Sequence, residues 1–455
     1  MSRRCAGFVA GVLAGVLLVV APLSSSAAAD GALAASTAAA TVVTRSPFGL
    51  SFEYPLMEKA LGPGPCPGPA LVASLKELGS PTVRVGGDSQ DLAGPSAAYP
   101  GPSAAYHYFV PPSFWTALGC LARESGSPIV VGLNFAEGPV ADEQTTIAEA
   151  QQAIPASQLS FSLGNEPDLY GFSHILPNEP GFTVPAYRPA PWTAQEFASE
   201  WTSRRAQLGS IPIEGPDLAG IGWRETMTGA LEQNPPVAMT VHAYPTAACG
   251  SAAAPTTAAR LLTKHASVGL VEKYAWLLSA AKAAARPAVI SESNSGSCGG
   301  RPGVSDEPVA GVWAARYVVA AVLAGWTQVR FHNAGTSYDA LALGADGGVG
   351  LRPLGQALEF LHRWIPVPSR VSAASKNPEI LAAKVSAGGH VSLIVSSFAS
   401  KPTPYTISVA GGRSRLNTDT ISTAGTLERG GTVAVRADKA LVMLAPHTVV
   451  AVRVS

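Results

Sequence analysis

The chain has few charged residues and no excess of one sign. Only 14% of its 455 residues are charged, and 31 basic side chains balance 31 acidic ones. Binding to nucleic acid or to an anionic membrane depends on a surplus of Lys and Arg, so this balance argues against both kinds of partner. We expect a neutral, soluble protein of about two domains.

Cysteine is scarce, and no two cysteines have the C-x-x-C spacing of a zinc site. Cys5 lies in the N-terminal segment. The other four, Cys66, Cys120, Cys249 and Cys298, are an even number and allow one or two disulfides in an oxidising compartment. Two disulfides among four cysteines permit three pairings, which the spacing alone leaves open. We expect neither a metal nor a cofactor.

Long apolar runs are absent except at the N-terminus. There, two arginines precede an apolar run over about residues 6–23, and small residues follow. This pattern predicts a secretory signal peptide over residues 1–29, cleaved near Ala28 or Ala29; an uncleaved membrane anchor is the alternative. No other segment has the roughly 18 consecutive apolar residues of a membrane span. We therefore expect a secreted, extracellular protein without membrane contact after cleavage.

Eight short apolar runs end at polar or glycine-containing tips. They span residues 48–54, 82–88, 128–134, 159–166, 211–217, 237–244, 288–293 and 327–333. Stretches with helical periodicity follow most of them, most clearly at 70–79, 112–125, 193–209 and 312–325. This alternation predicts a (β/α)8 TIM barrel over residues 45–365. A doubly wound open sheet is the alternative, but no phosphate-binding glycine loop follows the first run.

The pattern changes near residue 366. From there to residue 455 the apolar residues alternate in period two between Gly, Asn and Ser breaks, which predicts an all-β sandwich domain. Residues 30–44 are expected to be a linker, and its end, "AAATVVT" (38–44), could add a strand to this domain.

The barrel prediction gives the polar strand tips a possible function, because a TIM barrel carries its active site at the carboxyl ends of its strands. The tip residues are Glu53, Asp88, Asn134, Asn165, Glu166, His242, Tyr244, Glu292, Asn294 and Asn333. Glu166 and Glu292 are carboxylates at the ends of otherwise apolar runs. Each alone could be a cap or a salt-bridged strand end. Two carboxylates facing each other across a barrel mouth are what glycoside hydrolysis requires.

Five motifs carry a resemblance to a known family. "LGNEP" (163–167) and "ISESNSGSCGG" (290–300) resemble the acid/base and nucleophile segments of clan A glycoside hydrolases. "VRVGGD" (83–88), "VHAY" (241–244) and "FHNAGTSY" (331–338) are similar to motifs of glycoside hydrolase family 79, the heparanase and β-glucuronidase family. The resemblance covers nearly the whole mature chain, including the β-sandwich.

The resemblance implies a secreted, retaining β-glucuronidase. Glu166 would be the general acid/base and Glu292 the nucleophile that forms a covalent glycosyl-enzyme. Retention requires the two carboxyl groups to lie about 5 Å apart. The implied partner is a glucuronide-bearing carbohydrate or glycoconjugate, and we expect the enzyme to act as a monomer.

The resemblance also implies a set of substrate-binding residues. Asn165 would contact the sugar 2-hydroxyl, in an interaction that strengthens in the transition state. Tyr244 would orient the nucleophile and keep it ionised. Glu53 and Asp88 would bind other hydroxyls of the sugar whose glycosidic bond is cleaved.

Recognition of a uronic carboxylate would fall to Tyr338 and to backbone amides near Gly299 and Gly335. The chain departs from the family pattern beside these residues. At the fifth position after the nucleophile the family has an aromatic residue, whereas this chain has Ser297, followed by Cys298. The sugar specificity could differ accordingly.

Two other functions remain open. One is a clan A retaining enzyme for a neutral sugar, such as a β-glucosidase, β-xylosidase or arabinofuranosidase. The other is a non-catalytic carbohydrate-binding protein on the same barrel.

The barrel order favours one disulfide pairing. Cys249 and Cys298 follow the sixth and seventh apolar runs, which would be neighbouring strands, so we expect these two cysteines to be bonded. Cys66 and Cys120 would then form the second pair.

Overall fold

A computed structural model describes residues 40–95, 107–175, 183–249, 254–344, 347–409 and 412–455. The expected signal peptide (1–29) and most of the expected linker lie outside these ranges. Within them, every helix is too short or too polar to cross a bilayer.

The core of the molecule is a closed barrel of eight parallel strands. The strands are β2 (Phe48–Glu53), β3 (Thr82–Gly86), β6 (Ile129–Leu133), β7 (Leu159–Leu163), β10 (Ile213–Leu218), β11 (Ala238–His242), β12 (Ala288–Ser293) and β13 (Gln328–Asn333). Each strand pairs with the strands before and after it in this list, and β13 pairs with β2 to close the ring. The predicted (β/α)8 barrel is therefore confirmed, and its eight strands are the eight apolar runs.

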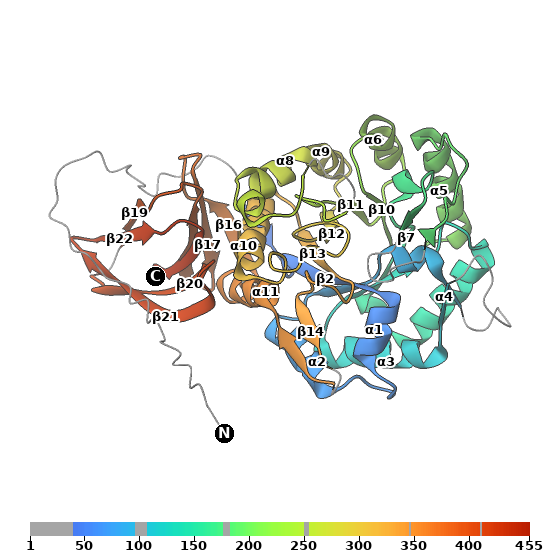
Figure 1. Cartoon of the computed structure of the whole chain (residues 1–455), viewed down its shortest axis with the longest axis horizontal. Coiled ribbons are helices and arrows are strands. Elements are labelled where there is room, and N and C mark those ends of the chain that lie inside the picture. Colours follow the sequence, from blue (N-terminus) through green and yellow to red (C-terminus); the bar gives the residue numbers. More distant parts are fainter. Residues whose placement is uncertain (1–39, 96–106, 176–182, 250–253, 345–346, 410–411) are drawn as a thin grey trace, which may run out of the picture.

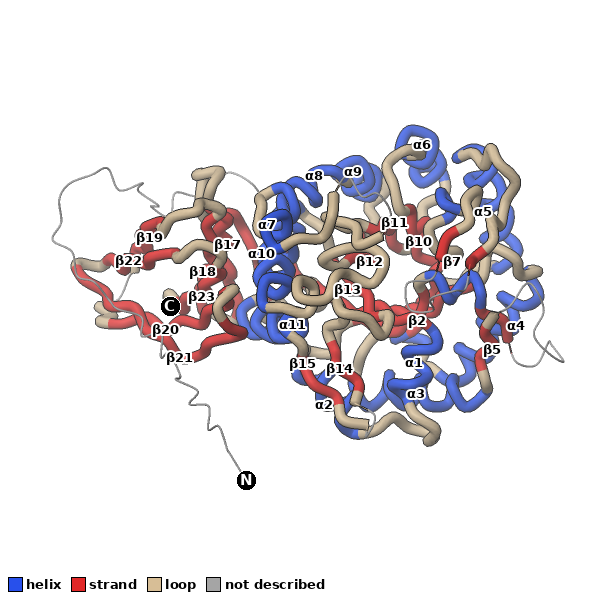
Figure 2. Tube along the Cα trace, in the orientation of Figure 1, coloured by secondary structure: helices blue, strands red, loops and turns tan. Residues whose placement is uncertain are grey.

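Helices surround the barrel (Figure 2). The longer ones are α1 (Tyr54–Leu61), α2 (Pro69–Glu77), α3 (Pro112–Ser125), α4 (Val140–Ala153), α5 (Ala194–Leu208), α6 (Arg224–Gln233), α9 (Ala275–Ala283), α10 (Pro308–Ala324) and α11 (Pro353–Trp364). Local sequence defines several ends. Thr193 and Glu196 form a capping box at the start of α5, and Gly325 ends α10 in the left-handed conformation.

Short elements fill the connections. Two short helices, α7 (Ala258–Leu261) and α8 (Leu270–Lys273), flank the π-helical turn η5 (His265–Gly269). Single turns of 3-10 helix occur at η1 (Asp88–Leu92), η3 (Ala156–Gln158) and η4 (Pro167–Leu169). Three small two-stranded sheets pair β4 (Ala93–Pro95) with β5 (Tyr108–Val110), β8 (His174–Ile175) with β9 (Thr183–Val184), and β14 (Leu341–Leu343) with β15 (Val349–Leu351).

The second domain is a nine-stranded antiparallel sheet, which confirms the predicted all-β domain. In sheet order the strands are β1 (Thr41–Val43), β16 (Ser369–Ala373), β17 (Ile380–Ala387), β18 (His390–Ser397), β23 (Thr448–Arg453), β20 (Arg415–Ser422), β21 (Gly425–Arg436), β22 (Lys439–Leu444) and β19 (Thr403–Ser408). The sandwich is made by one continuous sheet rather than two. The sheet bends so that Leu393 of β18 and Tyr405 of β19 share one core. β1 comes from the far end of the chain and pairs with β16.

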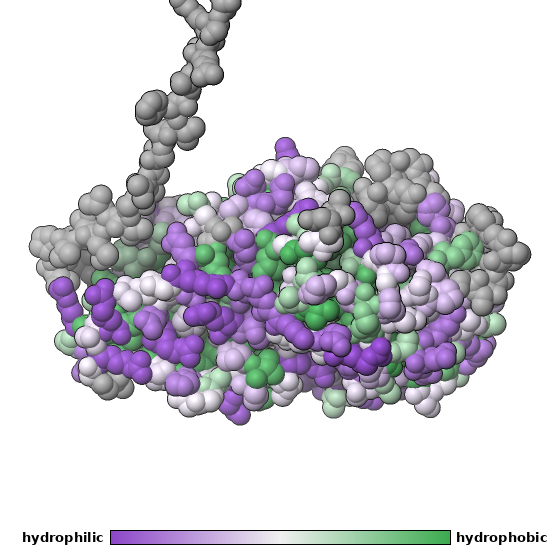
Figure 3. Space-filling model, turned by 90° about the horizontal axis from the view of Figure 1, so that it is seen from below, coloured by the Kyte–Doolittle hydropathy of each residue, from purple (hydrophilic) through white to green (hydrophobic). Residues whose placement is uncertain are grey.

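The two domains lie side by side, with α10 and α11 at their junction (Figure 1). Trp313 and Tyr317 of α10 are fully buried. A helix that is apolar on all faces must be buried on all faces. α10 is buried in this way because it packs on barrel strand β13 and on strands of the sheet domain. On the face seen in Figure 3, hydrophilic residues make up most of the surface of both domains, with smaller hydrophobic groups between them.

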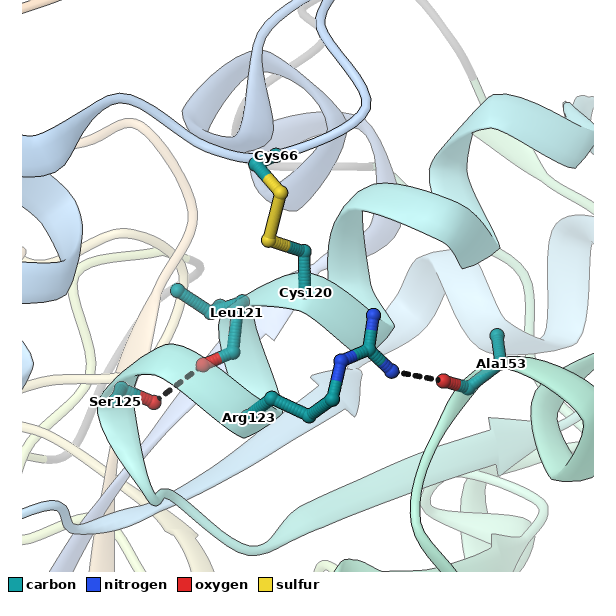
Figure 4. The surroundings of a disulfide bond; sticks show 6 residues. All are labelled: Cys66, Cys120, Leu121, Arg123, Ser125 and Ala153. Atoms are coloured by element: carbon teal, nitrogen blue, oxygen red, sulfur yellow. Dashed lines mark hydrogen bonds between the residues drawn. A yellow bond between two sulfur atoms is a disulfide. The ribbon is translucent and has the colours of Figure 1, made fainter.

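A disulfide between Cys66 and Cys120 ties the loop before α2 to helix α3, with a Cα–Cα distance of 5.2 Å (Figure 4). In the same helix Arg123 donates to the carbonyl of Ala153 at the end of α4. These contacts lie on the helical shell of the barrel.

Candidate active site

The carboxyl ends of the barrel strands enclose a pocket of about 730 Å³. Its polar lining includes Glu53, Asp88, Glu166, Tyr244, Glu292, His332 and Tyr338. The strands themselves are buried on both faces, so the first side chains that can reach solvent are those at the strand ends. The pocket therefore gathers carboxylates, imidazoles and phenols against apolar barrel walls.

Glu292, near the end of β12, is held at both carboxylate oxygens. Tyr244 donates its hydroxyl to Oε1 at 2.8 Å, and Arg84 donates Nη1 to Oε2 at 2.9 Å. Burial by itself would raise the pKa of Glu292, but the nearby positive charges of His332, His242 and Arg84, together with the Tyr244 hydrogen bond, lower the pKa to about 2. Glu292 is therefore an oriented carboxylate, ionised at neutral pH.

Arg84 is a site residue that the sequence analysis quoted within a motif but did not single out. It is 0% exposed. Besides Glu292 it donates to Asn165 Oδ1 at 3.0 Å and forms an ion pair with Asp217 at 3.4 Å. A charged residue in the middle of the apolar run "TVRVG" was the available signal, because a buried Arg needs partners.

The two glycines after Arg84 leave room for this network. A Cβ at Gly86 would lie 2.8 Å from Arg84 Cζ. Gly87 has φ +77°, and a Cβ there would collide with the Glu53 carboxylate. The Gly-Gly pair of "VRVGGD" is thus explained by close packing around Arg84 and Glu53.

Glu166 follows β7 in the left-handed conformation, with φ 49° and ψ 50°. Its backbone amide donates to the carbonyl of Asp217, and its Oε1 lies 2.9 Å from His242 Nδ1. The side chain keeps 20% exposure. Burial raises the pKa of Glu166, and the contact with His242 offsets only part of this rise. Glu166 thus favours the protonated form more than an exposed Glu does.

The two glutamates are close together. One carboxylate oxygen of each, and one ring nitrogen of His242, all lie within 4.8 Å of one another. Such a trio has the donor types of a metal site. The Arg84 guanidinium at 2.9 Å from Glu292 disfavours a cation there, because it already supplies the positive charge.

His242 and Asp217 are buried next to the two glutamates. His242 is fully buried, and burial would lower its pKa, but the carboxylates of Glu292, Glu166 and Asp217 raise the pKa instead. Asp217 accepts a hydrogen bond from the Ser291 hydroxyl and faces Arg84. "VHAY" pointed to His242; Asp217 ends the run "IPIEGPD" and was not identified.

Glu53 and His332 form a second buried pair. His332 Nε2 lies 3.0 Å from Glu53 Oε1, and the amide of Ser89 donates to Glu53 Oε2. Burial would lower the pKa of His332, but Glu292 and Glu53 raise it to about 9. His332 is thus a protonated neighbour of Glu292, and sequence reasoning missed it although it lies within "FHNAGTSY".

Asn165 is positioned by its neighbours. Its backbone amide donates to Asp91 at 2.8 Å, its Oδ1 accepts from Arg84, and its Nδ2 donates to Asp88 at 3.2 Å. One amide hydrogen is therefore left for a ligand at most. Asp91 is a buried acceptor that the sequence analysis did not identify, and burial raises its pKa to about 7.

Three other predicted tip residues have structural contacts. Asn134 donates to the Ala93 carbonyl, Asn294 to the carbonyls of His332 and Tyr338, and Asn333 to the Ser51 carbonyl. These asparagines hold the loops at the mouth.

Of the residues expected to bind a uronic carboxylate, Tyr338 lies in the pocket, whereas the Gly335 amide is already hydrogen-bonded within the protein. Tyr338 lines the pocket, with its ring 6.0 Å from that of His332. The expectation for Gly335 needs correction: its amide already donates to Asp339 Oδ2 at 3.0 Å. A carboxylate of the protein thus occupies this donor. The Gly299 carbonyl accepts from Ser337 and brings that loop against the Tyr338 segment.

A disulfide joins Cys249 to Cys298, the pair expected from strand order, with a Cα–Cα distance of 5.8 Å. Both cysteines line the pocket. Ser297, beside Cys298, also lines it. The disulfide therefore forms part of the pocket wall.

No family model and no curated protein sequence matches the chain. Solved structures with a similar fold include several glycoside hydrolases. A 4-O-α-L-rhamnosyl-β-D-glucuronidase from Fusarium oxysporum 12S has a TM-score of 0.73 and 18% identity, covering 91% of this chain and 97% of that chain. The GH51 arabinofuranosidase from Xanthomonas axonopodis pv. citri has a TM-score of 0.67 and 14% identity, covering 92% of this chain and 98% of that chain. A GH30 endoxylanase from Clostridium papyrosolvens C71 has a TM-score of 0.57 and 10% identity, covering 91% of this chain and 98% of that chain. At these identities the similarity is one of fold.

Proposed function

We propose that the protein is a retaining glycosidase in which Glu166 is the acid/base and Glu292 the nucleophile. The observation that carries the proposal is the close approach of two carboxylates, within 4.8 Å at their nearest oxygens, whose pKa values are shifted in opposite directions. Retaining enzymes have carboxyl groups about 5–5.5 Å apart, whereas inverting enzymes need about 6.5–9.5 Å to admit water. A raised pKa suits an acid, and a lowered pKa suits an ionised nucleophile.

The reaction then has two balanced steps. Protonated Glu166 gives its proton to the glycosidic oxygen while Glu292 attacks the anomeric carbon, so the bond to the leaving group breaks and an ester to Glu292 forms. Ionised Glu166 next takes a proton from water, the resulting hydroxide attacks the same carbon, and Glu292 is released. Tyr244 and Arg84 hold the nucleophile oriented between these steps.

We further propose a β-glucuronide as substrate and membership of family 79. The five sequence motifs and the Fusarium β-D-glucuronidase neighbour support this choice. Tyr338, a phenol in the pocket beside protonated His332, is the candidate donor to the uronic carboxylate. The alternative is a neutral sugar, favoured by the arabinofuranosidase and xylanase neighbours and by Ser297 in place of an aromatic residue. Secretion after removal of residues 1–29 belongs to the same proposal.

The test uses the catalytic pair. Glu292→Gly should lower hydrolysis of p-nitrophenyl β-glucuronide by at least about 1,000-fold, because no nucleophile remains. Azide should restore turnover and yield the α-glycosyl azide, since it attacks from the face that Glu292 occupied. Glu166→Gly with azide should instead yield the β-glycosyl azide from a substrate with a good leaving group. Product anomers are read by NMR.

Exposed Glu272→Gln is the matched control and should retain full activity. Measuring p-nitrophenyl β-glucoside in parallel separates the glycone from the mechanism. Azide products of the same anomer from both glutamate variants would contradict the assignment of roles. A preference for the glucoside would refute the glucuronide and leave the retaining mechanism in place.

A further inference from the structure

Charge is divided unevenly along the pocket. Four carboxylates, Glu53, Asp88, Glu166 and Glu292, line its inner part at the strand ends. The outer wall comes from the insertion between β11 and α9, which contributes two basic residues, His265 and Lys273. Among the described residues, no carboxylate lies within 4.0 Å of the basic nitrogens of either side chain.

Side chains of helix α10 hydrogen-bond to the backbone of the insertion and hold it in place. Trp313 Nε1 of α10 donates to the Ala266 carbonyl at 2.8 Å, and Arg316 Nη1 donates to the Leu262 carbonyl at 3.1 Å. Lys273 places Nζ 5.2 Å from the centre of the Tyr274 ring.

This wall lies on the side of Glu166. Tyr274 donates its hydroxyl to the Ala219 carbonyl, and the amide of Ala219 donates to Asp168, two residues beyond Glu166. The charges of Glu166 and Asp168 also contribute to the raised pKa of Tyr274, after burial. An acid that protonates the leaving oxygen must stand beside the leaving group. The leaving group therefore departs along the wall that Lys273 borders.

We propose that Lys273, assisted by His265, forms a leaving-group subsite for an aglycone that carries an anionic group, a carboxylate or a sulfate. This inference rests on the proposed glycosidase function and adds the chemical class of the aglycone. The unpaired ammonium group would meet the anion at the pocket rim, where an ion pair forms with little desolvation cost.

The test compares 4-carboxyphenyl and 4-sulfophenyl glycosides with the uncharged 4-carbamoylphenyl glycoside, in both the glucuronide and the glucoside series. Lys273→Gln should reduce the kcat/KM ratio of charged to uncharged aglycone by about 3–5-fold, mainly through KM, as for an exposed ion pair. The wild-type ratio should fall in 1 M NaCl. Lys264→Gln, exposed on the same insertion but not in the pocket lining, is the control and should leave the ratio unchanged.

The charged and uncharged aglycones differ in leaving-group reactivity, but this difference is the same in every variant. It therefore cancels when the kcat/KM ratios of two variants are compared. Equal ratios for Lys273→Gln and wild type would overturn the subsite. A loss confined to one of the two charged aglycones identifies carboxylate or sulfate as the group bound. If neither glycone is hydrolysed, the proposed function fails, and calorimetry with the corresponding 1-thioglycosides tests the subsite separately. Tighter binding of the charged aglycone that Lys273→Gln abolishes would support it; equal or undetectable binding would overturn it.

Discussion

Arg84 illustrates how one side chain organises the site at the scale of a residue. Its guanidinium contacts Glu292, Asn165 and Asp217, which come from three different strand ends. A buried charge costs several kcal/mol unless it is paired, so Arg84 and the buried carboxylates beside it each depend on the other for charge compensation. The acidic cluster is stable because Arg84 and His332 supply positive charge inside it.

His242 should control the pH dependence of the reaction. Its positive charge and hydrogen bond lower the pKa of Glu166 against the rise caused by burial, and its charge also lowers the pKa of Glu292. His242→Gln removes the charge, so both pKa values rise. In the proposed mechanism protonated Glu166 is the acid, so the basic limb of the kcat/KM profile should move to higher pH. The acid limb, which follows ionisation of Glu292, should also rise.

The measurement is kcat/KM against pH with the p-nitrophenyl substrate, and kcat should fall about 10-fold or more with the loss of orientation. His390→Gln, exposed in the sheet domain, is the control. An unchanged basic limb in His242→Gln would show that Glu166 is not the group that titrates there.

At the scale of elements, the strand ends and the loops have different roles in the pocket. The strand ends position Glu53, Glu292 and His332 through buried hydrogen bonds, whereas the outer wall of the pocket is built from loops. The loops after β11 and β12 also pair through the backbone: the Ser297 amide donates to the Thr246 carbonyl, and the Ala248 amide donates to the Ser297 carbonyl. The strand-end side chains should therefore keep their positions when changes in the wall alter substrate binding.

Removal of the Cys249–Cys298 disulfide tests this division. The Cys249→Ser/Cys298→Ser variant should raise KM about 5-fold or more with little change in kcat, because the wall loosens while the strand ends stay fixed. Closing a loop of 49 residues also stabilises the fold by about 2–4 kcal/mol, so the melting temperature should fall. Cys66→Ser/Cys120→Ser, remote from the pocket lining, should lose stability with unchanged KM. A similar KM effect in both variants would refute the role of the wall.

At the scale of the whole molecule, α10 joins barrel and sheet domain. Arg316 is 1% exposed and donates Nε to the Ser396 hydroxyl and Nη2 to the Ser397 carbonyl, both at 2.8 Å. Burial lowers its pKa to about 10. On the neighbouring helix, Trp364 donates to Asp419 of β20. These polar contacts across an otherwise apolar junction predict that the domains unfold together.

Arg316→Met should lower the free energy of unfolding by about 1–3 kcal/mol, because the Ser397 carbonyl is left buried without its donor. Calorimetry should show one transition for the wild type and a lower, broader or divided one for the variant. Exposed Arg370→Met on β16 is the control and should change stability little. Two separate transitions in the wild type would contradict the coupling of the domains.

Local sequence determined the elements of this protein. The eight barrel strands could be read from their apolar runs because buried parallel strands need continuous apolar residues, and helix α5 from the helical periodicity of residues 193–209. The polar tips marked where Glu166 and Glu292 would lie. The boundaries differ by a few residues; the fifth run begins at Ile211, whereas β10 begins at Ile213, after Pro212, which has no backbone donor.

Contacts between distant residues were decided only by the tertiary structure. Arg84 and Glu292 are 208 positions apart, and no local pattern links them. The same holds for His332, which lies beside Glu53, 279 positions away in the sequence. Residue type and spacing specify which groups stand at the strand ends. Closure of the barrel decides which of them meet, and burial together with the neighbouring charges then sets their protonation states.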